Sequence, residues 1–156
     1  VKYTRLLATG STAFEMSADE VATAANNMKV GFKLDKVDGL KEFFDVVNLL
    51  DNKVTNAGAA DILTATSLTA GNANLLGLNE KAASAIAASM LSTGKAPSVV
   101  GTSLNSLYTR LANVDNQGKK FHEALATIGL DAGYLKTAIG KDAAGAVTLF
   151  LGGAAL

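Results

Sequence analysis

The residues of this 156-residue chain with the most reactive side chains are a single histidine, scattered carboxylates and a few serines. His122-Glu123 matches the first half of the zinc-binding HExxH motif, but Ala126 stands where the second histidine is needed. That motif holds zinc through two imidazoles one helical turn apart. We therefore interpret His122 as a surface residue on a helix, and we predict no metal site and no cofactor.

Three Gly-Lys pairs resemble the end of a phosphate-binding loop. They are Gly94-Lys95, Gly118-Lys119 and Gly140-Lys141. None combines a glycine five positions earlier with a following Ser or Thr, and none follows a predicted strand, so the full loop is missing. The first and third pairs are more typical of helix ends, and the second of a loop.

Acid–base and nucleophilic catalysis also lack their usual partners. With one histidine and no nucleophile elbow, no serine has a recognisable activating base. Asp19 and Glu20 adjoin at a predicted helix start, where carboxylates stabilise the helix dipole, and this explains the pair better than a catalytic role does. We predict that the protein is not an enzyme.

Composition narrows the remaining classes. Fourteen basic and fourteen acidic residues give zero net charge without a charged block, which gives no support to sequence-specific nucleic-acid binding. The absence of cysteine excludes disulfides and thiolate metal sites and permits a reducing compartment. At 49% hydrophobic but only 6% aromatic, the chain has enough apolar residues for one domain whose core is built by close helix approach.

Two uncharged stretches are candidate membrane segments. Residues 62–79 carry Thr, Ser and Asn throughout, and residues 143–156 are too few to span a bilayer, which needs about 20 apolar residues. The second stretch fits a buried terminal helix, an interfacial helix or the start of something longer; we favour the first and do not expect membrane contact. Because no Met precedes Val1, we expect residues 1–156 to be a single helical domain cut from a longer protein, with residues 1–10 the tail of an upstream helix.

Helix signals organise the rest of the chain. Ser17 followed by Glu20 is a capping box. Between residues 75 and 111, Gly77 closes one helix, Asn79 caps the next, Gly94 ends it and Pro97 opens another. We predict that the helices on either side of Gly94 form an antiparallel hairpin, with Gly101 as its close-contact point.

Apolar residues recur at helical spacing along nearly the whole chain, and no stretch alternates with period two. We predict an all-α, compact multi-helix bundle of about seven or eight short helices. Breaks are expected near residues 9–11, 35–38, 56–58, 71, 115–118 and 140, and the helix of residues 59–76 has the weakest pattern. The residues predicted to face the core are Val21, Ala25, Met28, Phe32, Leu40, Phe43, Phe44, Val47, Leu50, Val54, Ile62, Leu63, Thr66, Ala70, Ala83, Ile86, Ala87, Met90, Leu91, Val100, Leu104, Leu107, Leu111, Val114, Phe121, Ala124, Leu125, Ile128, Leu135, Ala138, Ile139, Val147, Phe150 and Leu151.

One ordered set of residues resembles the conserved domain of phage tail tape measure proteins. A small-residue helix is followed by a G-x-x-x-x-x-x-G-T-x-L pattern, an Arg-Leu pair and an Ile-Gly-Leu segment. The resemblance covers most of the chain. The residues that stand on the pattern are Gly94, Gly101, Thr102, Leu104, Arg110, Leu111, Gly129 and Leu130.

The resemblance implies a non-enzymatic component of a phage or prophage tail. Such a protein is long and mostly helical, lies in the lumen of the tail tube, sets tail length, templates assembly of the tube and leaves ahead of the DNA. Its partners would be the tail-tube protein, tail assembly chaperones and other copies of itself, after synthesis in the host cytoplasm. The matched residues, together with the cap residues Gly77 and Asn79, would be structural rather than catalytic.

Two alternatives remain open. A membrane-interacting or pore-forming helical segment is suggested by the alanine and glycine content and by the apolar C-terminus, and it predicts binding to liposomes. A generic helical adaptor predicts a stable stoichiometric complex with a partner that is not a phage protein. A parent gene of great length between tail-tube and baseplate genes would favour the tail component over both.

Overall fold

The computed structural model describes residues 1–154 and contains, within them, nine α-helices, one 3-10 helix and no β-strand. The all-helical class is therefore confirmed, with nine α-helices against the seven or eight expected. The helices are α1 (Lys2–Phe14), α2 (Ala18–Gly31), α3 (Val37–Lys53), α4 (Ala59–Leu76), α5 (Glu80–Leu91), α6 (Pro97–Ala112), the 3-10 helix η1 (Val114–Asn116), α7 (Lys119–Thr127), α8 (Ala132–Lys141) and α9 (Ala143–Ala154).

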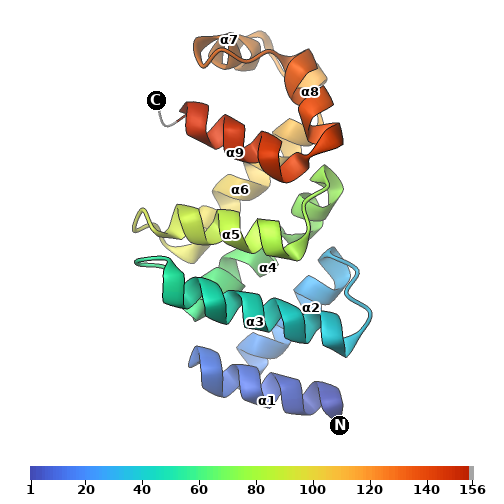
Figure 1. The fold of residues 1–156 in the computed structure, drawn as a ribbon, viewed down its shortest axis with the longest axis vertical. Coiled ribbons are helices and arrows are strands. Elements are labelled where there is room, and N and C mark those ends of the chain that lie inside the picture. Colours follow the sequence, from blue (N-terminus) through green and yellow to red (C-terminus); the bar gives the residue numbers. More distant parts are fainter. Residues whose placement is uncertain (155–156) are drawn as a thin grey trace.

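The helices form a stack of two layers. In one layer α1, α3, α5 and α9 follow one another along the long axis of the molecule and run in the same direction (Figure 1). In the other layer α2 packs on α4, and α4 packs on α6. The helices α7 and α8 close the end of the stack opposite α1 (Figure 1). Consecutive helices therefore alternate between layers from α1 to α6, and the two most extensive helix contacts, α4 with α6 and α2 with α4, lie within one layer.

Helix α4 is the centre of the stack, although its sequence pattern is the weakest. It packs against α2, α3, α5 and α6, and it is buried around most of its circumference. Its buried hydroxyls are satisfied within the helix, because Thr66 Oγ1 donates to the Ile62 carbonyl at 2.7 Å and Thr69 Oγ1 to the Thr66 carbonyl at 3.0 Å. A helix buried on many sides has no polar face, which is why period analysis underrates it.

Glycines allow close helix crossings at three places in the stack. A Cβ at Gly10 would lie 2.7 Å from Phe44 Cε2, and a Cβ at Gly31 would lie 2.9 Å from the backbone of α4 at Gly71 N. A Cβ at Gly101 would lie 3.0 Å from Leu68 Cδ1 of α4. With so few large side chains, the core depends on these short distances between helix axes.

Three sequence predictions need correction here. Helix α1 does not end at residues 9–11 but continues to Phe14, because Gly10 is a packing position. Gly71 does not interrupt α4, which continues to Leu76, and a Cβ at Gly71 would meet no atom within 4 Å. Gly101 is a close-contact point, but against α4 rather than within the α5–α6 hairpin; α6 packs mainly on α4.

Most predicted helix ends are confirmed. Ser17 and Glu20 form the full capping box, and Asn79 Oδ1 accepts from the Ala82 N–H at 2.8 Å. The start expected at residue 35 or 38 lies between them, at Val37, and has no side-chain cap. The break at residue 140 lies one residue too early, because α8 ends at Lys141.

The C-terminal helix α9 buries one face, including Ala143, Ala146 and Val147, and leaves Leu149 45% exposed. Residues 155 and 156, the end of the apolar stretch, lie outside the described residues. No helix within residues 1–154 combines the length and the apolar character needed to cross a membrane.

Candidate functional site

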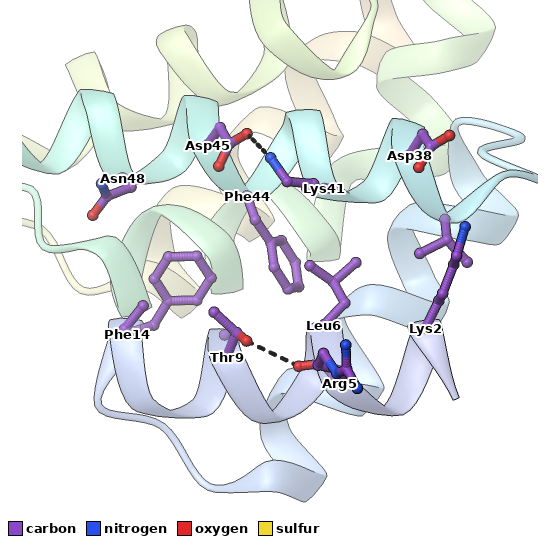
Figure 2. A pocket seen from close by; sticks show the side chains of 13 residues that line it. Lys2, Arg5, Leu6, Thr9, Phe14, Asp38, Lys41, Phe44, Asp45 and Asn48 are labelled. Atoms are coloured by element: carbon purple, nitrogen blue, oxygen red, sulfur yellow. Dashed lines mark hydrogen bonds and ion pairs between the residues drawn. The ribbon is translucent and has the colours of Figure 1, made fainter.

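An open groove lies between α1 and α3, with a volume of about 530 Å³ (Figure 2). Its lining is mostly apolar. It runs along three turns of each helix and opens to solvent, so its shape is a trough rather than an enclosed cavity. The residues that line it are Lys2, Arg5, Leu6, Thr9, Gly10, Ala13 and Phe14 of α1 and Val37, Asp38, Lys41, Phe44, Asp45 and Asn48 of α3.

Packing around Gly10 builds the floor of the groove. Because Gly10 lacks a side chain, Phe44 of α3 reaches the backbone of α1, and the Phe14 ring packs edge-on against Phe44 with centroids 5.2 Å apart. Leu6 points into the gap from α1 toward Phe44 (Figure 2). An edge-on aromatic pair is worth about 0.5–1.5 kcal/mol beyond its buried area, so the floor is held in place.

The two walls differ in charge. Lys2 and Arg5 lie on the α1 wall, and Asp38 and Asp45 lie on the α3 wall (Figure 2). On α3, Lys41 Nζ donates to Asp45 Oδ2 at 2.8 Å, and this hydrogen bond and the carboxylate charge raise the pKa of Lys41. Within residues 1–154, Lys2, Arg5 and Asp38 take part in no ion pair.

The residues singled out by the sequence do not converge on this groove or on one another. Gly77, Gly94 and Gly129 have φ angles of 101°, 84° and 74° and end helices. Asn79 caps α5. The remaining predicted residues are distributed over two segments, with Gly101, Leu104 and Leu111 buried in α6, Thr102 exposed on α6, and Leu130 half-buried before α8.

Most of these positions therefore lie at helix ends or are buried in α6. Their assignment to the tape measure pattern stays a prediction. Sequence reasoning missed the groove because its lining comes from two separate segments; the only local signals were the Phe43-Phe44 pair and the small residues at positions 9, 10 and 13.

One spacing runs against the expectation that no serine has an activating base. Ser92 and Lys95 stand in a Ser-x-x-Lys order, which in some hydrolases joins a nucleophile to its base. Here α5 ends at Leu91, and Gly94 adopts a φ of 84° between the two residues. The Ser92 hydroxyl donates to the Ser89 carbonyl at 2.6 Å, so it serves the helix end.

The other reactive residues are also dispersed. His122 lies half-buried on α7, where its ring meets the Phe121 ring edge-on with centroids 6.5 Å apart. Among the described residues, no three His, Asp or Glu side chains gather where they would hold a metal ion. The chemistry that the fold does display is an apolar trough with charged walls.

Comparison with known proteins identifies the class. The family model described as "Phage-related minor tail protein" matches residues 1–154. The match spans almost the whole chain, so the chain belongs to the phage-related minor tail protein family and is a phage tail protein. No curated protein and no solved structure matches it.

Proposed function

We propose that this chain is a helical module of a tape measure protein, which sets the length of the tail and templates assembly of the tail tube. The observation that carries the proposal is the family match over residues 1–154. The order of the glycine and leucine residues from Gly94 to Leu130 supports the tape measure class within that family.

The fold agrees with a role based on shape. Each layer adds one helix after another along a single axis (Figure 1). The chain exposes 8474 Å², whereas a compact protein of 15.9 kDa exposes about 7,400 Å². The excess surface fits a stacked module that presents side faces to surrounding proteins, and we propose the tail-tube protein, assembly chaperones and further copies of the chain as the partners that bind them.

The role we propose is non-enzymatic and located in the tail lumen. The buried hydroxyls of α4 and α5 donate to carbonyls of their own helices, and the Asn72–Asn105 contact at 2.9 Å joins α4 to α6. Asn105 also donates to the Leu68 carbonyl at 2.9 Å. Side chains engaged in this way stabilise a shape.

The test is an in-frame deletion of the codons for residues 1–154 in the phage genome, followed by electron microscopy of the tails. As one continuous helix these residues would span about 230 Å at 1.5 Å each. As the stack they span about 50 Å, from five successive helices along the long axis about 10 Å apart. We expect the deletion to shorten the tail by one of these two lengths, and a duplication of the same codons to lengthen it. The size of the change shows whether the tail contains the extended helix or the stack.

Tails of unchanged length in the deletion phage would contradict the proposal. Gly71→Ala in the same gene is the control, because its methyl group enters open space. Copurification of the chain with the tail-tube protein, but not with liposomes, would separate the tail function from a membrane-interacting one.

A further inference from the structure

We propose that the groove between α1 and α3 binds an amphipathic helix of another protein, with large apolar side chains on its buried face and opposite charges on its two flanks. The proposal is independent of the tape measure assignment. It rests on the length of the groove, the apolar character of its floor and the charges of its walls.

The groove has the length of a helix. Its lining extends from Lys2 to Phe14 on α1 and from Val37 to Asn48 on α3. At 1.5 Å per residue these spans are about 18 Å and 17 Å, or about three helical turns. A trough of this length accepts a ridge of side chains spaced three and four residues apart, whereas a compact small molecule would fill only part of it.

The floor admits a helix backbone at close range. Thr9 and Ala13 line the groove from α1 and are exposed, and neither is long enough to fill it. Between them, Gly10 has no side chain to fill the trough, so the largely buried Phe44 and Phe14 rings form its bottom. An apolar floor with small flanking residues is the surface that an apolar helix face covers in helix-in-groove recognition.

The charges on the two walls determine which charges the flanks of the bound helix should carry. Lys2 and Arg5 attract carboxylates along α1, and Asp38 attracts an amine along α3. A fatty acid or another amphiphile with one head group would meet attraction at one wall and repulsion at the other. A helix with acidic residues on one flank and basic residues on the other can match both walls. Whichever flank is acidic, the helix can bind in the direction that places that flank beside α1.

The binding experiment uses the 156-residue chain and three fluorescent 18-residue peptides. Each peptide has leucine at helical spacing on one face; the flanks carry Glu and Lys in the first, Lys on both sides in the second and Glu on both sides in the third. Fluorescence anisotropy should give micromolar binding of the mixed peptide and binding at least about tenfold weaker for the other two.

Two variant pairs locate the site. Thr9→Trp fills the groove and should weaken the mixed peptide at least about tenfold, whereas Thr12→Trp, an exposed α1 position that does not line the groove, should leave binding unchanged. Lys2→Glu with Arg5→Glu makes both walls acidic and should shift the preference to the all-Lys peptide. The matched control is Lys120→Glu with Lys141→Glu, on exposed positions of α7 and α8.

Several results would overturn the proposal. These are equal binding of all three peptides, no binding of any, or no loss with Thr9→Trp while circular dichroism shows the variant folded. Palmitate binding that Thr9→Trp abolishes, without peptide binding, would assign the groove to an acyl chain instead. Concentration-dependent self-association that Thr9→Trp abolishes would assign it to a second copy.

Discussion

At the scale of single residues, the stack depends on backbone conformations that reverse the chain between helices. Six of the connections within residues 1–154 contain one residue with positive φ. Glycine occupies three of them, and side-chain-bearing residues occupy the other three. A left-handed residue with a Cβ is less stable by about 1–2 kcal/mol, so the turns of the first half carry strain that the later turns avoid. The six residues are Glu15, Lys33, Asn56, Gly77, Gly94 and Gly129.

This difference predicts that replacing a left-handed glycine lowers the stability of the protein, whereas introducing glycine at a left-handed residue with a side chain raises it. Gly94→Ala should lower the free energy of unfolding by about 1 kcal/mol, because its φ of 84° disfavours a Cβ while nothing crowds the site. Glu15→Gly should raise it by up to about 1 kcal/mol. Urea denaturation monitored by circular dichroism measures both, with Ala13→Gly in α1 as the control expected to be destabilising. A destabilised Glu15→Gly would show that the side chain of Glu15 compensates for its conformation.

Tyr108 is a second residue that we expect to lower the stability of the native state. It is fully buried in α6, and its hydroxyl has no hydrogen-bond partner within the described residues. Burial raises the pKa of Tyr108 above the ordinary value of 10.0. An unpaired buried hydroxyl costs about 1–3 kcal/mol, so Tyr108→Phe should leave stability unchanged or raise it.

The same residue predicts a dependence on pH. Above pH 10 the unfolded chain loses the Tyr108 proton while the folded chain retains it, so the native state should lose up to about 1.4 kcal/mol per pH unit until the folded pKa is reached. Denaturation series at pH 9 to 11 should show a smaller loss in Tyr108→Phe than in the wild type, with Tyr134→Phe, an exposed phenol, as control. Identical pH profiles for the wild type and Tyr108→Phe would refute this.

At the scale of elements, the crossing of α2 and α4 requires glycine at one position only. Gly31→Ala should destabilise by at least about 2 kcal/mol, because its Cβ would enter the backbone of α4 at Ala70 and Gly71. Gly71→Ala, exposed on α4, should stabilise by about 0.5–1 kcal/mol through helix propensity. Thermal and urea denaturation of the two variants compare their free energies of unfolding with that of the wild type. Equal changes in Gly31→Ala and Gly71→Ala would mean that α2 and α4 do not cross this closely.

The start of α4 has a cap that comes from α3. Asp51 Oδ1 accepts from the Ala59 N–H at 3.1 Å, while the N-cap residue, Gly58, has no side chain. Asp51→Ala should therefore cost about 1 kcal/mol, and Asp51→Asn, which keeps the acceptor oxygen, should cost less. Asp61→Ala is the control, because Asp61 has an exposed carboxylate in the first turn of α4. Its loss of stability measures the contribution of a carboxylate to the helix dipole without the hydrogen bond. An equal loss in Asp51→Asn and Asp51→Ala would exclude the hydrogen bond.

The elements differ in how far the sequence predicts them. Local signals predicted the Ser17 capping box and the Gly77–Asn79 corner, because the atoms involved lie within a few residues of one another. The role of Gly10 and the Asp51 cap depend on atoms from separate helices, so no local pattern reveals them. The groove between α1 and α3 was missed for the same reason.

At the scale of the molecule, the centre of the stack is α4, the helix with the weakest sequence pattern. The α5–α6 pair has clear helix signals, but α4 joins both layers and contacts four helices. Small residues and internally bonded hydroxyls make α4 narrow enough for neighbours on many sides. The shape of the module therefore depends on α4 and on the glycines that approach it.

The most direct test of a function based on shape is electron microscopy of tails from phage whose gene for this protein carries Gly31→Ala or Gly71→Ala. If the folded stack is what the tail requires, Gly31→Ala should give few tails or tails of irregular length at temperatures that unfold the variant domain. Gly71→Ala should give tails of wild-type number and length. Normal tails from Gly31→Ala under conditions in which its domain is unfolded would contradict the account.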